Sequence, residues 1–168
     1  MTAEERRTAI FEILEQAERP VSASSLAERF GVSRQLIVGD VALLRAGGAA
    51  IDATARGYVT REKQRTGLLR QVACRHRAED VERELLVMVD NGCAVLDVIV
   101  EHPVYGQLTG ALGLTSRYDV GQFILRSRQS QPLSLLTEGV HLHTLACPDE
   151  AAFLRVKREL AETGFLLE

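Results

Sequence analysis

A short polar stretch, "REKQRTG" at residues 61–67, separates two parts of the chain that have different hydrophobic patterns. Before this stretch, apolar residues recur at the spacing of helices. After it, segments in which apolar and polar residues alternate, as in β-strands, are interspersed with helical segments. The chain of 168 residues has room for two small domains. We therefore expect an N-terminal domain over residues 1–60, a hinge over residues 61–67 and a C-terminal domain over residues 68–168.

The N-terminal part has the pattern of three short helices followed by two short strands. Apolar residues at positions 10–17 recur at i, i+3, i+4 and i+7. Residues 22–48 then predict a short helix, a turn at Gly31 and a longer helix capped by Ser33, and residues 49–60 predict two strands around a turn. This combination is typical of a winged helix-turn-helix DNA-binding domain, although small three-helix domains also serve as protein docking units.

The longer helix and the turn between the two strands carry the candidate DNA-binding residues. Arg34 and Gln35 lie in the first turn of that helix, where donors to base edges belong, and Arg56 lies at the turn between the strands. Residues 1–60 hold eight acidic and seven basic side chains, so specific binding would depend on the geometry of a dimer. The predicted DNA-binding set is Ser33, Arg34, Gln35, Val38, Gly39, Arg45 and Arg56, with Arg61, Lys63 and Arg65 as further phosphate contacts.

The C-terminal part alternates strands and helices in the order βαββαβα. The expected strands are residues 68–75, 94–106, 107–115 and 140–146, and the expected helices are residues 78–91, 116–129 and 149–163. This order predicts a two-layer α/β domain with an antiparallel or mixed sheet and with its helices on one face.

Two of the four histidines, His141 and His143, are separated by one residue within an expected strand. Because alternate residues of a strand face the same side, the two imidazoles project together. His76 follows the first strand, and Glu84 is the carboxylate of the next helix best placed to turn inward. These four residues could bind a divalent transition metal, with Cys74 as a rival ligand. The alternative is a pair of histidines on a solvated strand face.

A second group of residues could bind a small anion. Ser116 and Asp119 have the spacing of a capping box at the start of a helix, where free amide groups attract anions, and Arg117 adds a bidentate donor. The alternative is that Ser116 only caps the helix and Arg117 only contacts solvent. His102 stands at a strand end, where it is either a hydrogen-bonded structural residue or a donor or ligand that lines the site.

The composition argues against several other classes of protein. No apolar segment approaches the roughly 20 residues of a membrane span, and the N-terminus has no secretory hydrophobic region. Cys74, Cys93 and Cys147 fit free thiols in a reducing compartment better than a disulfide framework. No nucleophile stands beside a general base, and there is no phosphate-binding loop. We therefore expect a cytoplasmic protein that is not an enzyme.

Longer motifs in the chain resemble one known family. This family is the nicotinate-responsive repressors of NAD biosynthesis and niacin uptake, which have a three-histidine domain. Two segments of the chain resemble that domain: "VIVEHPVYGQLTGALGLTSRYDVGQFI" and "QPLSLLTEGVHLHTLACPDEAA". Their N-terminal winged helix is similar to "VSRQLIVGDVALLRAGGAAIDATARGYV". The resemblance implies a homodimeric repressor that binds operator DNA. It also implies an HPr-like C-terminal domain that binds nicotinic acid as corepressor near a divalent transition metal, namely zinc, nickel or iron.

The resemblance also implies which residues form the sites. The family's metal ligands carry over to His76, Glu84, His141 and His143. His102, in the motif EHPVYG, matches the family's remaining histidine, and we expect nicotinate to bind near the metal. The expected effector-binding set is His102, Tyr105, Ser116 and Arg117. The chain departs from the family at Gly39, where a larger polar residue is usual, so the resemblance does not imply the operator sequence. A repressor that responds directly to the metal is the alternative function.

Overall fold

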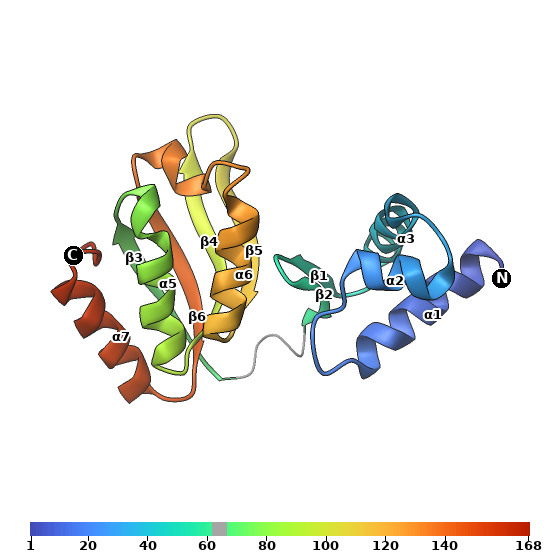
Figure 1. Ribbon diagram of the computed structural model, residues 1–168, viewed down its shortest axis with the longest axis horizontal. Coiled ribbons are helices and arrows are strands. Elements are labelled where there is room, and N and C mark those ends of the chain that lie inside the picture. The colour runs from blue at the N-terminus through green and yellow to red at the C-terminus, as the bar shows by residue number, and fades with distance from the viewer. Residues whose placement is uncertain (62–66) are drawn as a thin grey trace. The chain divides into compact units, whose positions relative to one another are not determined.

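The computed structural model describes residues 1–61 and 67–168, and the chain divides into two compact units between residues 64 and 65. The first unit consists of helices and a small hairpin, and the second is a sheet with helices against it (Figure 1). Most of the expected hinge, including Lys63 and Arg65, lies outside the described residues. Within the described part of the chain, no helix is long and apolar enough to cross a membrane.

Three helices with hydroxyl caps form most of the first unit. They are α1 (Ala3–Gln16), α2 (Ala23–Phe30) and α3 (Arg34–Ala46). Side chains of Thr2, Ser22 and Ser33 each accept a hydrogen bond from a main-chain N–H of the first turn, which is the role expected of Ser33. Helix α2 ends at Gly31, whose φ of 64° allows the sharp turn into α3. The expected helix-turn-helix is confirmed.

The hairpin that follows is the expected wing. Strands β1 (Ile51–Thr54) and β2 (Gly57–Thr60) pair antiparallel, and Val21 forms an isolated bridge to Tyr58. Gly57 has a φ of 134°, and a Cβ there would lie 2.6 Å from the Val21 carbonyl oxygen, so only glycine lets the hairpin approach this closely. The largest fully buried side chains of this unit are Ile10, Leu14, Leu26, Ile37, Val41 and Ile51.

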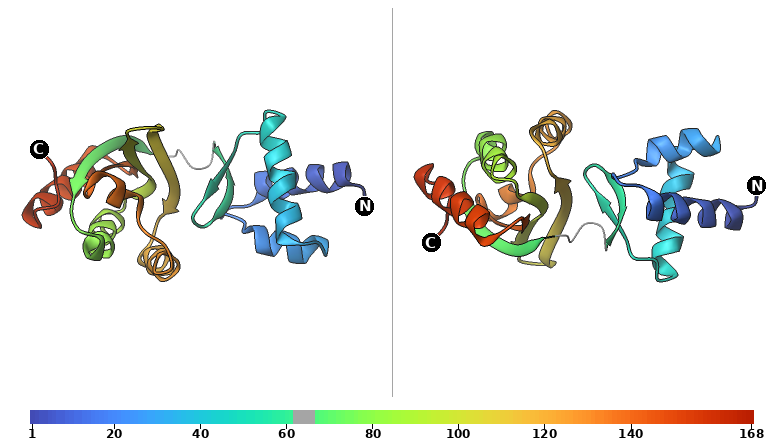
Figure 2. Two further views of the ribbon diagram at one scale, coloured as in Figure 1. Left: turned by 90° about the horizontal axis from the view of Figure 1, so that it is seen from above. Right: turned by 90° about the horizontal axis from the view of Figure 1, so that it is seen from below.

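The second unit has the expected order βαββαβα, and its sheet is wholly antiparallel in the order β3-β6-β4-β5. Its elements are β3 (Leu68–Arg75), α5 (Val81–Asp90), β4 (Ala94–His102), β5 (Gly106–Leu114), α6 (Arg117–Ser127), β6 (Val140–Cys147) and α7 (Glu150–Glu162). The expected helix over residues 78–91 begins with a 3₁₀ turn, η1 (Ala78–Asp80), before α5. A second 3₁₀ helix, η2 (Leu133–Thr137), precedes β6 and was not predicted from the sequence. Helices α5 and α6 lie side by side on one face of the sheet (Figure 2), and α7 contacts α5, β3 and β6.

The register of the strands gives the sheet two distinct ends. At one end, which we call the histidine end, β3 finishes at Arg75, β4 finishes at His102 and β6 begins at Val140. At the other, the cysteine end, β3 begins at Leu68 and β6 finishes at Cys147. Register shifts on both sides of β4 leave a bulge around Asp97.

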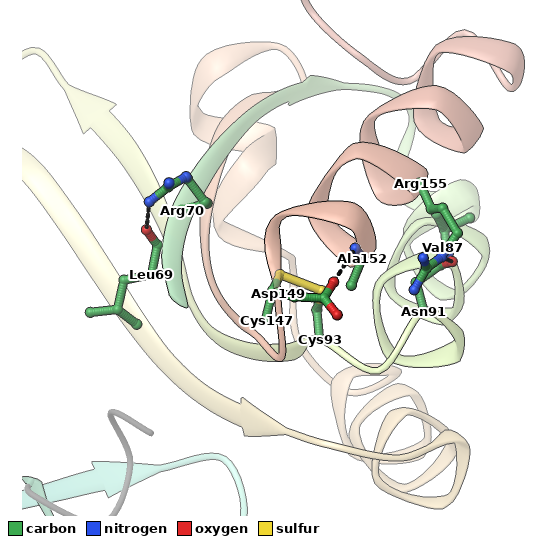
Figure 3. The surroundings of a disulfide bond; sticks show 9 residues. All are labelled: Leu69, Arg70, Val87, Asn91, Cys93, Cys147, Asp149, Ala152 and Arg155. Atoms are coloured by element: carbon green, nitrogen blue, oxygen red, sulfur yellow. Dashed lines mark hydrogen bonds between the residues drawn. A yellow bond between two sulfur atoms is a disulfide. The ribbon is translucent and has the colours of Figure 1, made fainter. Parts of the chain in front are cut away.

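Two cysteines at the cysteine end are joined, which corrects the expectation that all three are free thiols. Cys93 and Cys147 form a disulfide with their Cα atoms 4.2 Å apart (Figure 3). The cause is the register, since Ala94 pairs with Ala146 and the two cysteines flank this pair from adjacent strands. Cys74 is a buried free thiol.

Candidate metal centre, effector residues and DNA-binding surface

The four expected metal ligands lie together between α5 and the sheet. Glu84 turns inward from α5 and is only 1% exposed. His141 and His143 project from β6 toward Glu84, and His76 reaches it from just beyond β3. The Nε2 atoms of His76, His141 and His143 lie 2.7, 2.8 and 3.4 Å from the nearest Glu84 carboxylate oxygen. The expectation that Glu84 faces inward agrees with the structure.

The main chain orients all three imidazoles in the same way. Each Nδ1 donates a hydrogen bond to a carbonyl oxygen: His76 to Arg77 at 2.8 Å, His141 to Gly139 at 2.8 Å, and His143 to Asp97 at 2.6 Å. A ring nitrogen that donates to a carbonyl carries the proton, so each neutral imidazole has its lone pair on Nε2. All three Nε2 atoms therefore face Glu84, and His141 Nε2 forms a 2.8 Å hydrogen bond with Glu84 Oε1. Imidazoles oriented in this way by a carbonyl behind the ring are found in metal-binding histidines.

Three buried polar atoms of the histidine–glutamate cluster lack hydrogen-bond partners among the described residues. The atoms His76 Nε2, His143 Nε2 and Glu84 Oε2 are buried and make no aligned hydrogen bond within the described part of the chain, although His76 Nε2 is 2.7 Å from Glu84 Oε2. Buried polar atoms without partners are costly, and a cation would satisfy them. Three imidazole nitrogens and one carboxylate suit a divalent transition metal, so these residues fit such an ion.

The electrostatics of the cluster also favour a cation. Burial by itself would raise the pKa of Glu84, but the charge on His143 and hydrogen bonding to His141 hold it well below its ordinary value. Burial opposes protonation of His143, yet the Glu84 charge raises the pKa of His143. The buried carboxylate is therefore ionised and requires positive charge beside it, supplied either by protons on the histidines or by a metal ion.

Cys74 belongs to the same cluster. It pairs with His141 in the β3–β6 register, so both side chains face α5. Its Sγ, a Glu84 carboxylate oxygen and a ring nitrogen of His141 all lie within 4.8 Å of one another, and all three residues are buried. Burial and then the charge of Glu84 raise the pKa of the Cys74 thiol. The position of Cys74 as a rival ligand is therefore supported by geometry.

The C-terminal segment covers the outer side of the cluster, a feature that the sequence did not reveal. The Phe165 ring lies 5.2 Å from the His76 ring, and the Arg83 guanidinium lies over Phe165 at 5.3 Å. The Arg75 N–H donates to the Phe165 carbonyl at 2.9 Å, so the segment is attached along the edge of β3. No periodicity marks these last residues in the sequence.

The four expected effector residues are not brought together within one chain. His102 and Tyr105 lie at the turn of the β4–β5 hairpin, at the histidine end, whereas Ser116 and Arg117 follow β5 at the other end of the sheet. Strand β5 has nine residues, which separates the two pairs by roughly 25 Å. The expectation that all four residues bind one effector near the metal is therefore not met within one chain: only His102 and Tyr105 share the end of the sheet that holds the histidine cluster.

Ser116 and Arg117 have structural partners. Ser116 Oγ accepts the Asp119 N–H at 3.1 Å, as the capping pattern predicts, but Asp119 accepts from the Thr115 N–H at 2.9 Å instead of returning to Ser116. Arg117 donates to both carboxylate oxygens of Asp90, at 2.7 and 2.5 Å. Its guanidinium is thus engaged by the end of α5.

His102 has the opposite tautomer from the three clustered histidines. Its Nδ1 accepts the N–H groups of Val104 and Tyr105, at 3.1 and 3.2 Å, so the proton lies on Nε2. His102 is therefore a hydrogen-bonded residue at the end of a strand, which is one of its two expected roles. The Nε2–H of this half-buried residue is also suited to donate to an anion. The Tyr105 ring, 75% exposed, lies 5.0 Å from the His102 ring.

Most of the expected DNA-binding residues are on the surface of the first unit. Ser33, Arg34, Gln35, Gly39 and Arg45 are exposed on or at the start of α3, and Arg56 is half-buried at the wing turn. Val38 differs from the expectation, because it is half-buried and packs against the core. Arg61 forms an ion pair with Asp52 at 3.1 Å and so has a partner within the unit.

Helix α3 also has features that the pattern did not reveal. Asp40 is 3% exposed and pairs with Arg6 at 2.6 Å and with Arg7 at 3.7 Å, which ties α3 to α1. The only indication in the sequence that Asp40 is buried was its position next to Val41, a residue of the apolar stripe of this helix. Leu36 and Leu43 are exposed on the same helix, where an apolar side chain could contact a thymine methyl group.

Comparisons with known proteins agree with both units. Residues 69–168 match the family model described as the 3H domain, and residues 6–59 match one described as an HTH domain. The chain is 46% identical over 167 residues to a Thermotoga maritima protein named probable transcription repressor NiaR. The aligned region covers 98% of this chain and 95% of that protein. The chain is also 41% identical over 168 residues to the Bacillus subtilis protein named transcription repressor NadR, covering 97% and 93%. Both names describe regulators rather than enzymes, as expected from the sequence.

Proposed function

Because the chain belongs to the family of transcription repressors that join an HTH domain to a 3H domain, we propose that it represses genes of NAD biosynthesis and niacin uptake with nicotinic acid as corepressor. In this proposal the protein acts as a homodimer, and the corepressor binds near a divalent transition metal in the second unit. Zinc, nickel and iron are the candidate metals.

The observation that carries the metal part of the proposal is the shared orientation of three buried histidines. His76, His141 and His143 each donate through Nδ1 to a carbonyl, and their Nε2 atoms converge on one carboxylate oxygen pair. The ion would be held by these nitrogens and by Glu84. A bound transition metal would supply a Lewis-acidic positive centre that attracts an anionic or nitrogen-containing ligand.

The proposed corepressor site is at the histidine end of the sheet. Extension of the β4–β6 register, in which Ile99 pairs with Leu142, places His102 beside residue 139, next to the strand that bears the clustered histidines. The Nε2–H of His102 would donate to the nicotinate carboxylate, and the exposed Tyr105 ring would stack on the pyridine ring. Ser116 and Arg117 lie too far from this end to share the site within one chain.

The proposed DNA contacts are made by α3 and the wing. Arg34 and Gln35, in the first exposed turn of α3, would contact base edges in the major groove, and Arg45 and Arg56 would contact phosphates. Two copies of α3 in a homodimer would have to lie about 34 Å apart to enter successive major grooves. Corepressor binding would favour the dimer arrangement that has this spacing.

Fluorescence anisotropy with promoter DNA of the neighbouring genes tests this proposal. Nicotinate would be titrated into metal-loaded protein and into protein from which metal has been removed by a chelator. Tighter DNA binding with nicotinate in the metal-loaded protein alone supports the corepressor function. DNA affinity that follows the metal and ignores nicotinate would instead identify a metal-responsive repressor, and affinity that follows neither would overturn both.

A further inference from the structure

One buried group in the cluster has no role in the proposed set of three histidines and a glutamate. The Cys74 side chain is fully buried, faces α5 from β3 and lies opposite His141. Its Sγ is within 4.8 Å of both a Glu84 oxygen and a His141 ring nitrogen, and those two atoms are also within 4.8 Å of each other. Ligands of one transition-metal ion, each about 2.0–2.3 Å from it, are separated from one another by distances of this order.

Other atoms indicate where the sulfur is directed. The buried Glu84 Oε2, His76 Nε2 and His143 Nε2 lack aligned hydrogen-bond partners within the described residues. The two nitrogens lie 2.7 and 3.4 Å from Glu84 Oε2, on the carboxylate group that Sγ approaches. The cluster therefore has more buried donor atoms around Glu84 than hydrogen bonds to satisfy them.

We infer that Cys74 is a further ligand of the metal, binding it through Sγ together with Glu84 and His141. This inference rests on the proposed metal centre and adds to it a sulfur donor. As the sulfur–metal bond forms, the thiol proton leaves to solvent and the sulfur binds as thiolate. A thiolate favours the candidate metals zinc, nickel and iron and disfavours magnesium and manganese, which take oxygen ligands. The inference therefore also assigns the class of ion that the centre selects.

Cobalt(II) is the probe that distinguishes sulfur from nitrogen and oxygen ligands. The full-length chain would be loaded with Co²⁺ after chelation, and bound cobalt and the near-ultraviolet absorption spectrum would be measured together. We expect bound cobalt and an intense sulfur-to-cobalt charge-transfer band. In the Cys74→Ser variant the band should disappear, and cobalt affinity should fall by at least about tenfold, since even changes behind the ligands cost 10–100-fold.

The other two cysteines provide the matched control. The double variant C93S/C147S removes the disulfide and should keep both the cobalt and the band. A band that persists in Cys74→Ser would overturn the inference. Cobalt bound to the wild-type chain without a charge-transfer band would also overturn it while leaving the metal centre of three histidines and Glu84 intact. Failure to bind any cobalt would remove the metal centre as well. The wild-type spectrum decides the question even where Cys74→Ser fails to fold.

Discussion

Substitution of Gly139 by alanine should disrupt the metal centre without removing any of its ligands. Gly139 has a φ of 91°, and a Cβ at this position would clash with the His76 carbonyl oxygen. The Gly139 carbonyl is also the acceptor that orients His141. Alanine must therefore displace the main chain beside two of the histidines at once, and both Nε2 atoms should move away from Glu84.

The magnitude follows from two contributions. A non-glycine residue held in an unfavourable backbone region costs about 1–3 kcal/mol, and overpacking against a neighbour costs about 1–3 kcal/mol more. A loss of about 3 kcal/mol should lower the melting midpoint of a unit of this size by roughly 12–24 °C. Gly106→Ala is the matched control, because Gly106 also has a positive φ, 70°, but a Cβ there would meet nothing within 4 Å.

Thermal unfolding of the metal-free protein and titration with Co²⁺ would measure the two effects separately. We expect Gly106→Ala to lose some stability and to keep its metal affinity, and Gly139→Ala to lose more stability and to bind metal more weakly by at least tenfold. Equal stability losses in the two variants, together with unchanged metal affinity, would refute the reasoning that the turn at Gly139 positions the histidines.

Three further expectations concern the two units separately. Arg34→Ala should abolish operator binding measured by anisotropy while metal content, measured by mass spectrometry, stays the same; parallel loss of both would show that the assignment of DNA and metal binding to different units is wrong. His141→Ala combined with His143→Ala should remove the metal from the purified protein, and an unchanged metal content would dismiss this ligand set. Asp40→Ala should lower the melting midpoint of the first unit by several degrees more than Asp52→Ala, because the Asp40 side chain is nearly inaccessible while the Asp52 pair is partly solvated; equal shifts would contradict a role for Asp40 in joining α3 to α1.

Short-range periodicity was enough to predict most of the fold. The i, i+2 spacing of His141 and His143 gave their common direction, and the helical spacing around Glu84 gave its inward orientation. The strand at residues 68–75 has the bounds that its alternation predicted. These features depend only on residues close in the sequence, so a single sequence can reveal them.

Features that depend on register were not predictable in this way. The bulge at Asp97 and the pairing of Ala94 with Ala146 arise only when distant strands come together, and the second of these brings Cys93 beside Cys147. Arg117 likewise lies far from His102 because β5 runs away from the end of the sheet where His102 lies. His102 and Arg117 were expected to bind the same effector, whereas the nine residues of β5 carry the chain to the opposite end of the sheet.

The carbonyl groups behind the three histidines make the centre sensitive to one kind of evolutionary change and tolerant of another. The acceptors belong to the main chain at Arg77, Asp97 and Gly139, so most side-chain replacements at the first two positions would leave the oxygens in place. An insertion or deletion of one residue near the bulge or the turn would shift an oxygen away from its imidazole. Homologues of this chain should therefore diverge freely in composition around the centre while keeping the lengths of these segments fixed.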